Sequence, residues 1–170
     1  FVWQSLRDAL PGMPDSSQYE RGPLAWHLYA LLPEVKVPEV RRYLSAEPRE
    51  RQRVQLALQL AGVFDQYLIH RRDGVVAWEA EKEERVPPAS WQAPVWRALV
   101  ARLGKRHRAR LLAEFLALAA HGELDARALP DPVYAFALVD LPPDYLRLLH
   151  ALARYVDVHF LLPNPSAAYW

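Results

Sequence analysis

Residues 57–72 read ALQLAGVFDQYLIHRR and belong to the longest helix that the sequence predicts. The apolar residues around this stretch recur at the three- and four-residue spacing of one helix face, and they are Val54, Ala57, Leu58, Ala61, Phe64 and Leu68. The stretch ends in polar and cationic side chains, and Arg71 lies seven residues after Phe64, on the continuation of the apolar stripe. A guanidinium at the end of a core-facing stripe needs an anionic partner. This helix end is therefore the strongest local indication of function.

The composition is that of an ordinary folded protein. Of 170 residues, 52% are hydrophobic and 24% are charged, and 21 Lys and Arg against 20 Asp and Glu give a formal charge of +1. This balance does not indicate a nucleic-acid-binding protein, although a clustered basic patch would suffice for binding. The chain has no cysteine, which excludes disulfides, thiolate nucleophiles and cysteine zinc sites and fits a cytoplasmic protein.

The hydropathy pattern and the two ends of the sequence indicate what kind of chain this is. No apolar run reaches the roughly 20 residues that a membrane span needs, and the first residues do not resemble a signal peptide, so no membrane partner is expected. The chain begins without Met and ends at Tyr169-Trp170. We therefore expect it to be a fragment of a longer protein.

The first 128 residues predict a helical region. Proline, glycine and capping signals bound helices at 3–10, 23–32, 38–44, 48–70, 90–103 and 106–120. Asp73-Gly74 is expected to break the longest helix, with another helical turn at 75–79. Residues 79–85 carry six charges in seven positions, which predicts a solvated loop.

The pattern changes near residue 129. Residues 133–139 and 157–162 are apolar runs of strand length, and Pro142-Pro143-Asp144 opens a helix between them, with Leu146, Leu149, His150 and Ala153 on one face. Two such strands joined by a helix form a βαβ unit with parallel strands. Two strands alone are not a stable sheet, so we expect its remaining strands in sequence outside this chain. The predicted fold is α/β and predominantly helical, with a helical subdomain at 1–128 and part of an α/β domain at 129–170.

The motifs of common catalytic sites are missing from the sequence. Gly104-Lys105 is the only Gly-Lys pair and follows no predicted strand, and the turn at 139–144 has no glycine to cradle a phosphate. The six histidines lack metal-ligand spacing, and no Gly-x-Ser-x-Gly occurs. Asp140 ends a strand, where it either shapes the turn, which we favour, or binds metal. We expect no cofactor, no metal and no catalytic residue.

Basic residues cluster at 70–72 and at 105–110. Cations that open a helix oppose its macrodipole at a cost of about a few tenths of a kcal/mol each, and an anionic partner is one reason that would compensate this cost. A solvated surface is the other interpretation, which we favour on composition alone. Trp3, Tyr67, Trp78, Trp91 and Trp96 are candidates for stacking on nucleic-acid bases, although core packing is the better explanation for most of them.

Taken in order, these segments resemble the RecC family, the gamma chains of exodeoxyribonuclease V. The resemblance covers nearly the whole chain and lies in the order and spacing of short blocks. They are Phe1-Val2-Trp3, Pro23-Leu24-Ala25-Trp26-His27-Leu28, Val63-Phe64-Asp65-Gln66-Tyr67-Leu68, Trp78-Glu79, Trp91-Gln92-Ala93-Pro94-Val95-Trp96, His107-Arg108-Ala109, Leu141-Pro142-Pro143-Asp144-Tyr145-Leu146, Asn164-Pro165 and Tyr169-Trp170.

The resemblance implies a non-catalytic subunit of the RecBCD helicase–nuclease, which processes double-strand breaks for recombination. Its fold would be that of a superfamily 1 helicase that has lost its ATP site, with a 1B-type helical subdomain at 1–128 and a 1A-type segment at 129–170. The implied partners are RecB and RecD in a heterotrimer and single-stranded DNA. In the family, the helicase-like domains form a tunnel that scans the 3′-ended strand for the recombination hotspot Chi.

Matching blocks carry the family's Chi-contacting residues onto Trp3, Val63, Asp65, Arg71 and Arg108. In these roles Trp3 stacks on a base, the two arginines bind phosphate or a guanine edge, and Asp65 accepts from a base amino group. Gly62 departs from the motif, which has Asp there. The lost carboxylate implies that this protein reads a different hotspot, or none.

Two other hypotheses follow from the same residues. The first is a structural scaffold for partner subunits, in which the arginines are ion-paired and do not touch DNA. The second is an active helicase or nuclease domain, which the missing nucleotide and metal motifs disfavour. The position of the arginines relative to carboxylates and to each other separates the scaffold from the DNA-binding hypothesis.

Overall fold

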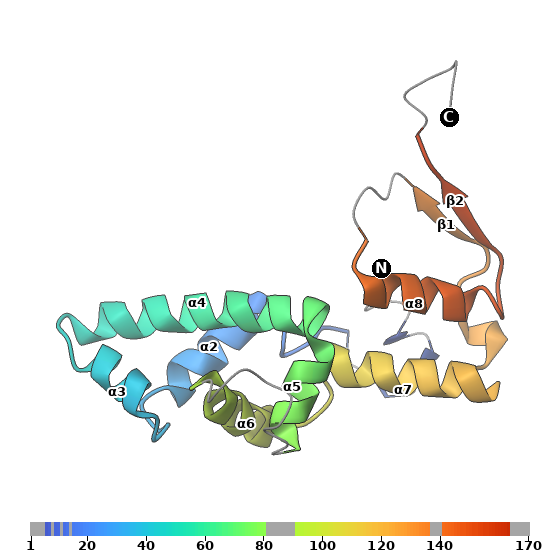
Figure 1. Ribbon diagram of the computed structural model, residues 1–170. Coiled ribbons are helices and arrows are strands. Elements are labelled where there is room, and N and C mark those ends of the chain that lie inside the picture. Colours follow the sequence, from blue (N-terminus) through green and yellow to red (C-terminus); the bar gives the residue numbers. More distant parts are fainter. Residues whose placement is uncertain are drawn as a thin grey trace. The chain divides into compact units, whose positions relative to one another are not determined.

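The computed structural model describes residues 6–7, 9–10, 12–13, 15–80, 91–136 and 141–163. This part of the chain is predominantly helical and contains a small two-stranded sheet (Figure 1). The chain divides into two compact units, one formed by Pro14–Leu111 and the other by Phe1–Met13 together with Leu112–Trp170. The helical character and the strand pair agree with the predicted fold class.

The unit Pro14–Leu111 is a packed group of helices. They are α2 (Arg21–Leu31), α3 (Pro38–Leu44), α4 (Arg49–His70), α5 (Arg72–Glu79) and α6 (Gln92–Leu103). Helix α2 packs along α4, and α5 packs against α6. The centre is apolar and fully buried at Leu24, Leu28, Phe64, Trp96 and Leu99. The helices predicted at 23–32, 38–44 and 48–70 are thereby confirmed to within two residues, as is the end of the helix at Leu103.

The core-facing stripe of α4 differs from the predicted one. Its buried residues are Leu56, Ala57, Leu60, Ala61, Phe64 and Leu68. Val54 and Leu58, which were expected to face the core, are 43% and 50% exposed. The helix carries apolar residues on two neighbouring faces, and the position of α2 decides which of them is buried.

The break after α4 also lies elsewhere than predicted. Arg71 has φ −134° and ψ 42°, so α4 ends at His70, and Asp73-Gly74 lies in the first turn of α5. The amides of Gly74 and Val75 donate to the carbonyl oxygen of Arg71 at 3.0 and 3.2 Å, which closes the new turn. Since Arg71 leaves the helical periodicity, it does not continue the apolar stripe as predicted, and the residue is exposed.

Helix α7 (Arg108–His121) begins in the first unit and continues into the second. The second unit also contains a 3₁₀ turn, η2 (Ala126–Ala128), then β1 (Val133–Phe136), α8 (Pro143–Leu152) and β2 (Val158–Leu161). Strands β1 and β2 are parallel, with Val133 opposite Val158, so the predicted βαβ unit is confirmed.

The buried face of α8 is partly different from the predicted one. Leu148, Leu149 and Leu152 are buried, whereas Leu146 is 49% exposed. The apolar residues of α8 occupy two neighbouring faces, and, as in α4, tertiary packing decides which of the two is buried. The predicted strand extension at 137–139 and Asp140 lie outside the described residues, as does most of the helix predicted at 3–10.

Candidate nucleic-acid interface

The junction between α4 and α5 presents Arg71 above an aromatic ring. The Cζ atom of Arg71 lies 5.3 Å from the centroid of the Tyr67 ring, within the range of a cation–π contact. The Tyr67 ring is held by two other aromatic rings, since its centroid lies 6.5 Å from that of Phe64 and 5.7 Å from that of Trp78. The Tyr67 hydroxyl donates to Oε1 of Gln92 at 3.2 Å. Packing therefore holds the guanidinium at the surface, and no carboxylate of the described residues forms an ion pair with it.

Two further predicted contact residues, Val63 and Asp65, lie on α4 shortly before this junction and are both partly buried. They share the C-terminal third of the helix with Gly62. The atoms nearest to a Cβ atom placed on Gly62 belong to the guanidinium of Arg21, with Nε and Nη2 each at 3.8 Å. This segment of α4 thus contains the carboxylate of Asp65 and a residue without a side chain, Gly62, next to the guanidinium of Arg21.

A buried carboxylate organises the second basic segment, which precedes and opens α7. Oε1 of Glu79, the last residue of α5, accepts from Nε2 of His107 at 2.6 Å. Oε2 of the same carboxylate accepts from Nε of Arg110 at 2.9 Å and forms an ion pair with Nη2 of the same guanidinium, also at 2.9 Å. The side chains of Glu79 and His107 are 1% and 0% exposed. The predicted solvated loop is therefore wrong at Glu79, which joins two helices.

The ionisation of Glu79 follows from its surroundings. Burial raises the pKa of this carboxyl group, but the hydrogen bonds and charges of His107 and Arg110 outweigh burial and leave the pKa below its ordinary value. Because an ionised carboxylate only accepts, Nε2 of His107 must donate its hydrogen. The burial of Glu79 could have been predicted from the sequence by helical spacing, because Glu79 lies four residues after Val75 on α5 and Val75 is buried.

Tyr19 holds the loop before α7 from another side. Its ring centroid lies 5.2 Å from that of His107 and 5.6 Å from that of Trp96. Its hydroxyl donates to the carbonyl oxygen of Gly104, the residue that ends α6 with φ +83°. Burial and the negative charge of Glu79 raise the pKa of Tyr19, so the hydroxyl stays a donor. Residues 104–107 are consequently fixed against α6.

The structure brings the two predicted basic segments to opposite ends of one short helix. Arg71 precedes α5, and Glu79 ends it by binding residues of the other segment; eight residues at 1.5 Å each span about 12 Å. Arg108 is partly buried. In the described ranges, neither Arg71 nor Arg108 forms an ion pair with a carboxylate, whereas Arg110 does.

The remaining predicted residues fall into two groups. Trp3 lies outside the described residues, so its position relative to the arginines stays a prediction. Trp78 and Trp96 are buried in the core, which confirms core packing for these two. Trp96 in addition donates from Nε1 to Oε1 of Glu79 at 3.4 Å.

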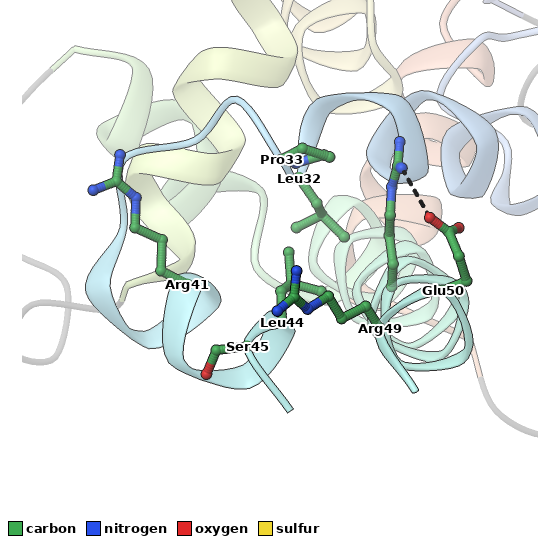
Figure 2. Close-up of a pocket in the computed structure, with 8 residues that line it drawn as sticks. Leu32, Pro33, Arg41, Leu44, Ser45, Arg49 and Glu50 are labelled. Atoms are coloured by element: carbon green, nitrogen blue, oxygen red, sulfur yellow. Dashed lines mark ion pairs between the residues drawn. The ribbon is translucent and has the colours of Figure 1, made fainter. Parts of the chain in front are cut away.

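A cavity of about 440 Å³ lies at the far end of α4 (Figure 2), and sequence reasoning did not find it. Its lining comes from the end of α2, from α3 and from the start of α4, and consists of Leu32, Pro33, Arg41, Leu44, Ser45, Arg49, Glu50 and Arg53. Two of its arginines are engaged. Nε of Arg49 lies 3.0 Å from Oε1 of Glu47, and Nε of Arg53 donates to the carbonyl oxygen of Tyr29 at 2.7 Å.

Two searches of the described residues concern other kinds of site. Among these residues, no group of three or more His, Asp or Glu side chains is arranged to hold a metal ion. The helices formed by the same residues include none that is both long enough and apolar enough to cross a membrane.

Comparison with known proteins agrees with the resemblance seen in the sequence. The family model described as RecC, N-terminal domain, matches residues 1–170. Similar curated proteins are each named RecBCD enzyme subunit RecC. The one from Escherichia coli K12 is 34% identical over 181 residues, covering 100% of this chain and 16% of that protein. The one from Haemophilus influenzae Rd is 30% identical over 201 residues, covering 100% and 18%. The one from Mycobacterium tuberculosis H37Rv is 31% identical over 180 residues, covering 98% and 16%.

The chain belongs to the RecC N-terminal domain family. It spans 16% to 18% of the length of these three relatives.

Proposed function

We propose that this chain is the N-terminal part of a RecC subunit and contacts single-stranded DNA within a RecBCD-type complex. The contact surface, called here the α4–α7 surface, consists of Val63, Asp65, Arg71 and Arg108. The names of the relatives support a place in a DNA-repair complex with RecB and RecD subunits. In this proposal the chain has no catalytic role and contributes to reading Chi during double-strand break processing.

The observation that carries the proposal is the contrast among neighbouring cations. Arg110 is closed by Glu79, but Arg71 and Arg108, in the same unit, have no carboxylate partner in the part of the chain that the structure describes. A guanidinium binds phosphate or the O6 and N7 edge of guanine in a bidentate manner. The carboxylate of Asp65 can accept from a base amino group, which adds selectivity to the charge.

The proposal also covers Trp3, which lies outside the described residues, and the assignment of the two segments to helicase-like domains. Trp3 is the proposed stacking residue, because the ring of Tyr67 already packs against Arg71 on one side and Trp78 on another. Residues 1–128 are the proposed helicase-like helical subdomain and residues 129–170 the proposed segment of its parallel-sheet domain. The parallel pairing of β1 and β2 supports this assignment of the second segment.

The test uses the full-length subunit assembled with its partners and carrying Arg71→Ala or Arg108→Ala. We expect weaker binding of single-stranded oligonucleotides and weaker Chi-dependent switching of nuclease activity. If a phosphate contact is lost, the slope of log affinity against log salt falls by about 0.7 for each arginine. Arg51→Ala is the matched control, because Arg51 is an exposed arginine of α4 twenty residues before Arg71. Binding and switching equal to those of the control in both variants would refute the proposal.

One observation favours a scaffold role instead. Glu79, His107 and Arg110 form a closed, buried cluster, which is the kind of contact expected of a part that holds helices together. If the surface serves subunit assembly, Arg71→Ala and Arg108→Ala will reduce co-purification with the partner subunits and leave the DNA affinity of intact complexes unchanged. Measuring both quantities on the same preparations separates the two functions.

A further inference from the structure

Gly62 occupies a position where the fold does not require glycine. It lies inside the 22-residue helix α4, where glycine costs roughly 0.5–1 kcal/mol relative to alanine. Its φ is not in the left-handed region, and a Cβ atom there would make only an ordinary contact with the Arg21 side chain at 3.8 Å. Neither backbone conformation nor packing explains the glycine. The missing side chain leaves half-buried backbone beneath a guanidinium.

Arg21 is a cation in an unfavourable place. It is the first residue of α2, whose first turn holds no acidic residue, so its charge opposes the helix macrodipole. The side chain is exposed. Across the described ranges no carboxylate lies within ion-pair distance of its guanidinium. The N-cap residue Glu20 places a carboxylate at this helix start, but that carboxylate accepts from the Ser17 amide at 3.4 Å. The Arg21 guanidinium therefore keeps its donors for an acceptor from another molecule.

The position of Arg21 connects it to the α4–α7 surface. Its guanidinium lies over Gly62, and Gly62 and Asp65 are three residues apart on one face of α4. Nine residues of helix, about 13 Å, separate Gly62 from Arg71. All of these residues belong to the unit Pro14–Leu111.

We propose that Arg21 is a further DNA-contacting residue, whose guanidinium, lying over Gly62, binds a hydrogen-bond acceptor of the single strand. This inference rests on the proposed function of the α4–α7 surface. The acceptor is a backbone phosphate or the O6 and N7 edge of a guanine, since both match the planar fork of arginine. Gly62 contributes the space in which the Arg21 guanidinium lies close to the helix.

The experiment titrates the assembled full-length complex, wild type, Arg21→Ala and Arg21→Lys, with two oligonucleotides. One contains guanine and the other contains 7-deazaguanine at the same positions. If the acceptor is phosphate, Arg21→Ala weakens binding to both equally and lowers the salt slope by about 0.7, and Arg21→Lys retains most of the affinity. If the acceptor is guanine, wild type loses about 5- to 100-fold on 7-deazaguanine, and Arg21→Ala and Arg21→Lys bind both strands equally weakly.

The control variants keep the inference separate from the proposed function. Arg51→Ala should bind both oligonucleotides as wild type does. If Arg21→Ala matches wild type in affinity and salt slope while Arg71→Ala is impaired, the role of Arg21 is refuted and the α4–α7 surface stands. If Arg71→Ala and Arg108→Ala also match wild type, the proposed function itself is refuted.

Discussion

Replacing Glu79 with Gln tests the contact that joins α5 to α7. The substitution keeps the shape of the side chain and removes its charge. The hydrogen bond from buried His107 changes from a bond to a charged acceptor, worth about 1.5–3 kcal/mol, to one between ordinary partners, worth about 0.5–1.5 kcal/mol. Arg110 is 38% exposed, so solvent screening limits its share to about 1 kcal/mol or less. We therefore expect a loss of about 1–2.5 kcal/mol at neutral pH.

Amide hydrogen exchange in the full-length subunit measures this loss where it occurs. The opening free energy of amides in α5 and in the first turn of α7 should fall by the stated amount, which is about 5- to 70-fold faster exchange after correction for intrinsic rates. Glu50→Gln is the matched control, because Glu50 is 74% exposed and its oxygen lies 3.8 Å from Arg53. The control should change exchange in its own region by about 0.5 kcal/mol or less.

The pH dependence of the same measurement follows from the lowered pKa of Glu79. A carboxyl group whose pKa is depressed in the folded state stabilises the protein above its unfolded pKa of about 4.3, and this stabilisation is lost as pH falls through the folded pKa. The difference between wild type and Glu79→Gln should therefore be full at neutral pH and shrink in acid. Exchange like that of the Glu50→Gln control at pH 7, or a difference that persists undiminished in acid, would refute the account of this cluster.

Two further substitutions test the face of α4 and its glycine. Leu60 is 3% exposed and Leu58 is 50% exposed, so Leu60→Ala should cost about 2–5 kcal/mol of local stability by hydrogen exchange and Leu58→Ala less than about 1 kcal/mol; equal costs would restore the stripe predicted from sequence. Gly62→Ala should raise the stability of α4 by roughly 0.5–1 kcal/mol and at the same time weaken single-strand binding by the assembled complex, because the methyl group fills the space beneath Arg21; a variant with both stability and affinity raised would contradict the role given to this glycine.

The positions of the elements were largely predictable because local signals bound them. Pro38 opens α3 and Gly104 ends α6 with a positive φ, as proline and glycine do at helix ends. The strand–helix–strand order near the C-terminus fixes a parallel pairing by chain geometry alone. These features depend on residues close together in sequence, and sequence patterns report such features well.

The orientation of side chains was less predictable, since distant residues decide it. Leu58 and Leu60 are equally apolar, and only the packing of α2 along α4 selects the second for the core. Glu79 stands at the start of a charge run, but its partners lie 28 and 31 residues further along the chain. Arg71 was expected to continue the apolar stripe because it lies seven residues after Phe64, but its backbone leaves the helical conformation directly after His70.

The cationic residues around α5 are of two kinds: some pair with the carboxylate of Glu79, and others have no carboxylate partner in the described ranges. The carboxylate of Glu79 is shared by His107 and Arg110, and each bond fixes the start of α7 relative to the end of α5. Arg108 follows His107 directly, so the backbone that carries it is held in place although its own guanidinium pairs with no carboxylate in the described ranges. Arg71 is likewise held by the packed ring of Tyr67 instead of by an opposite charge. When neighbouring residues hold a guanidinium in place, its donors remain available to an anion from another molecule. An ion pair within the chain would occupy those donors.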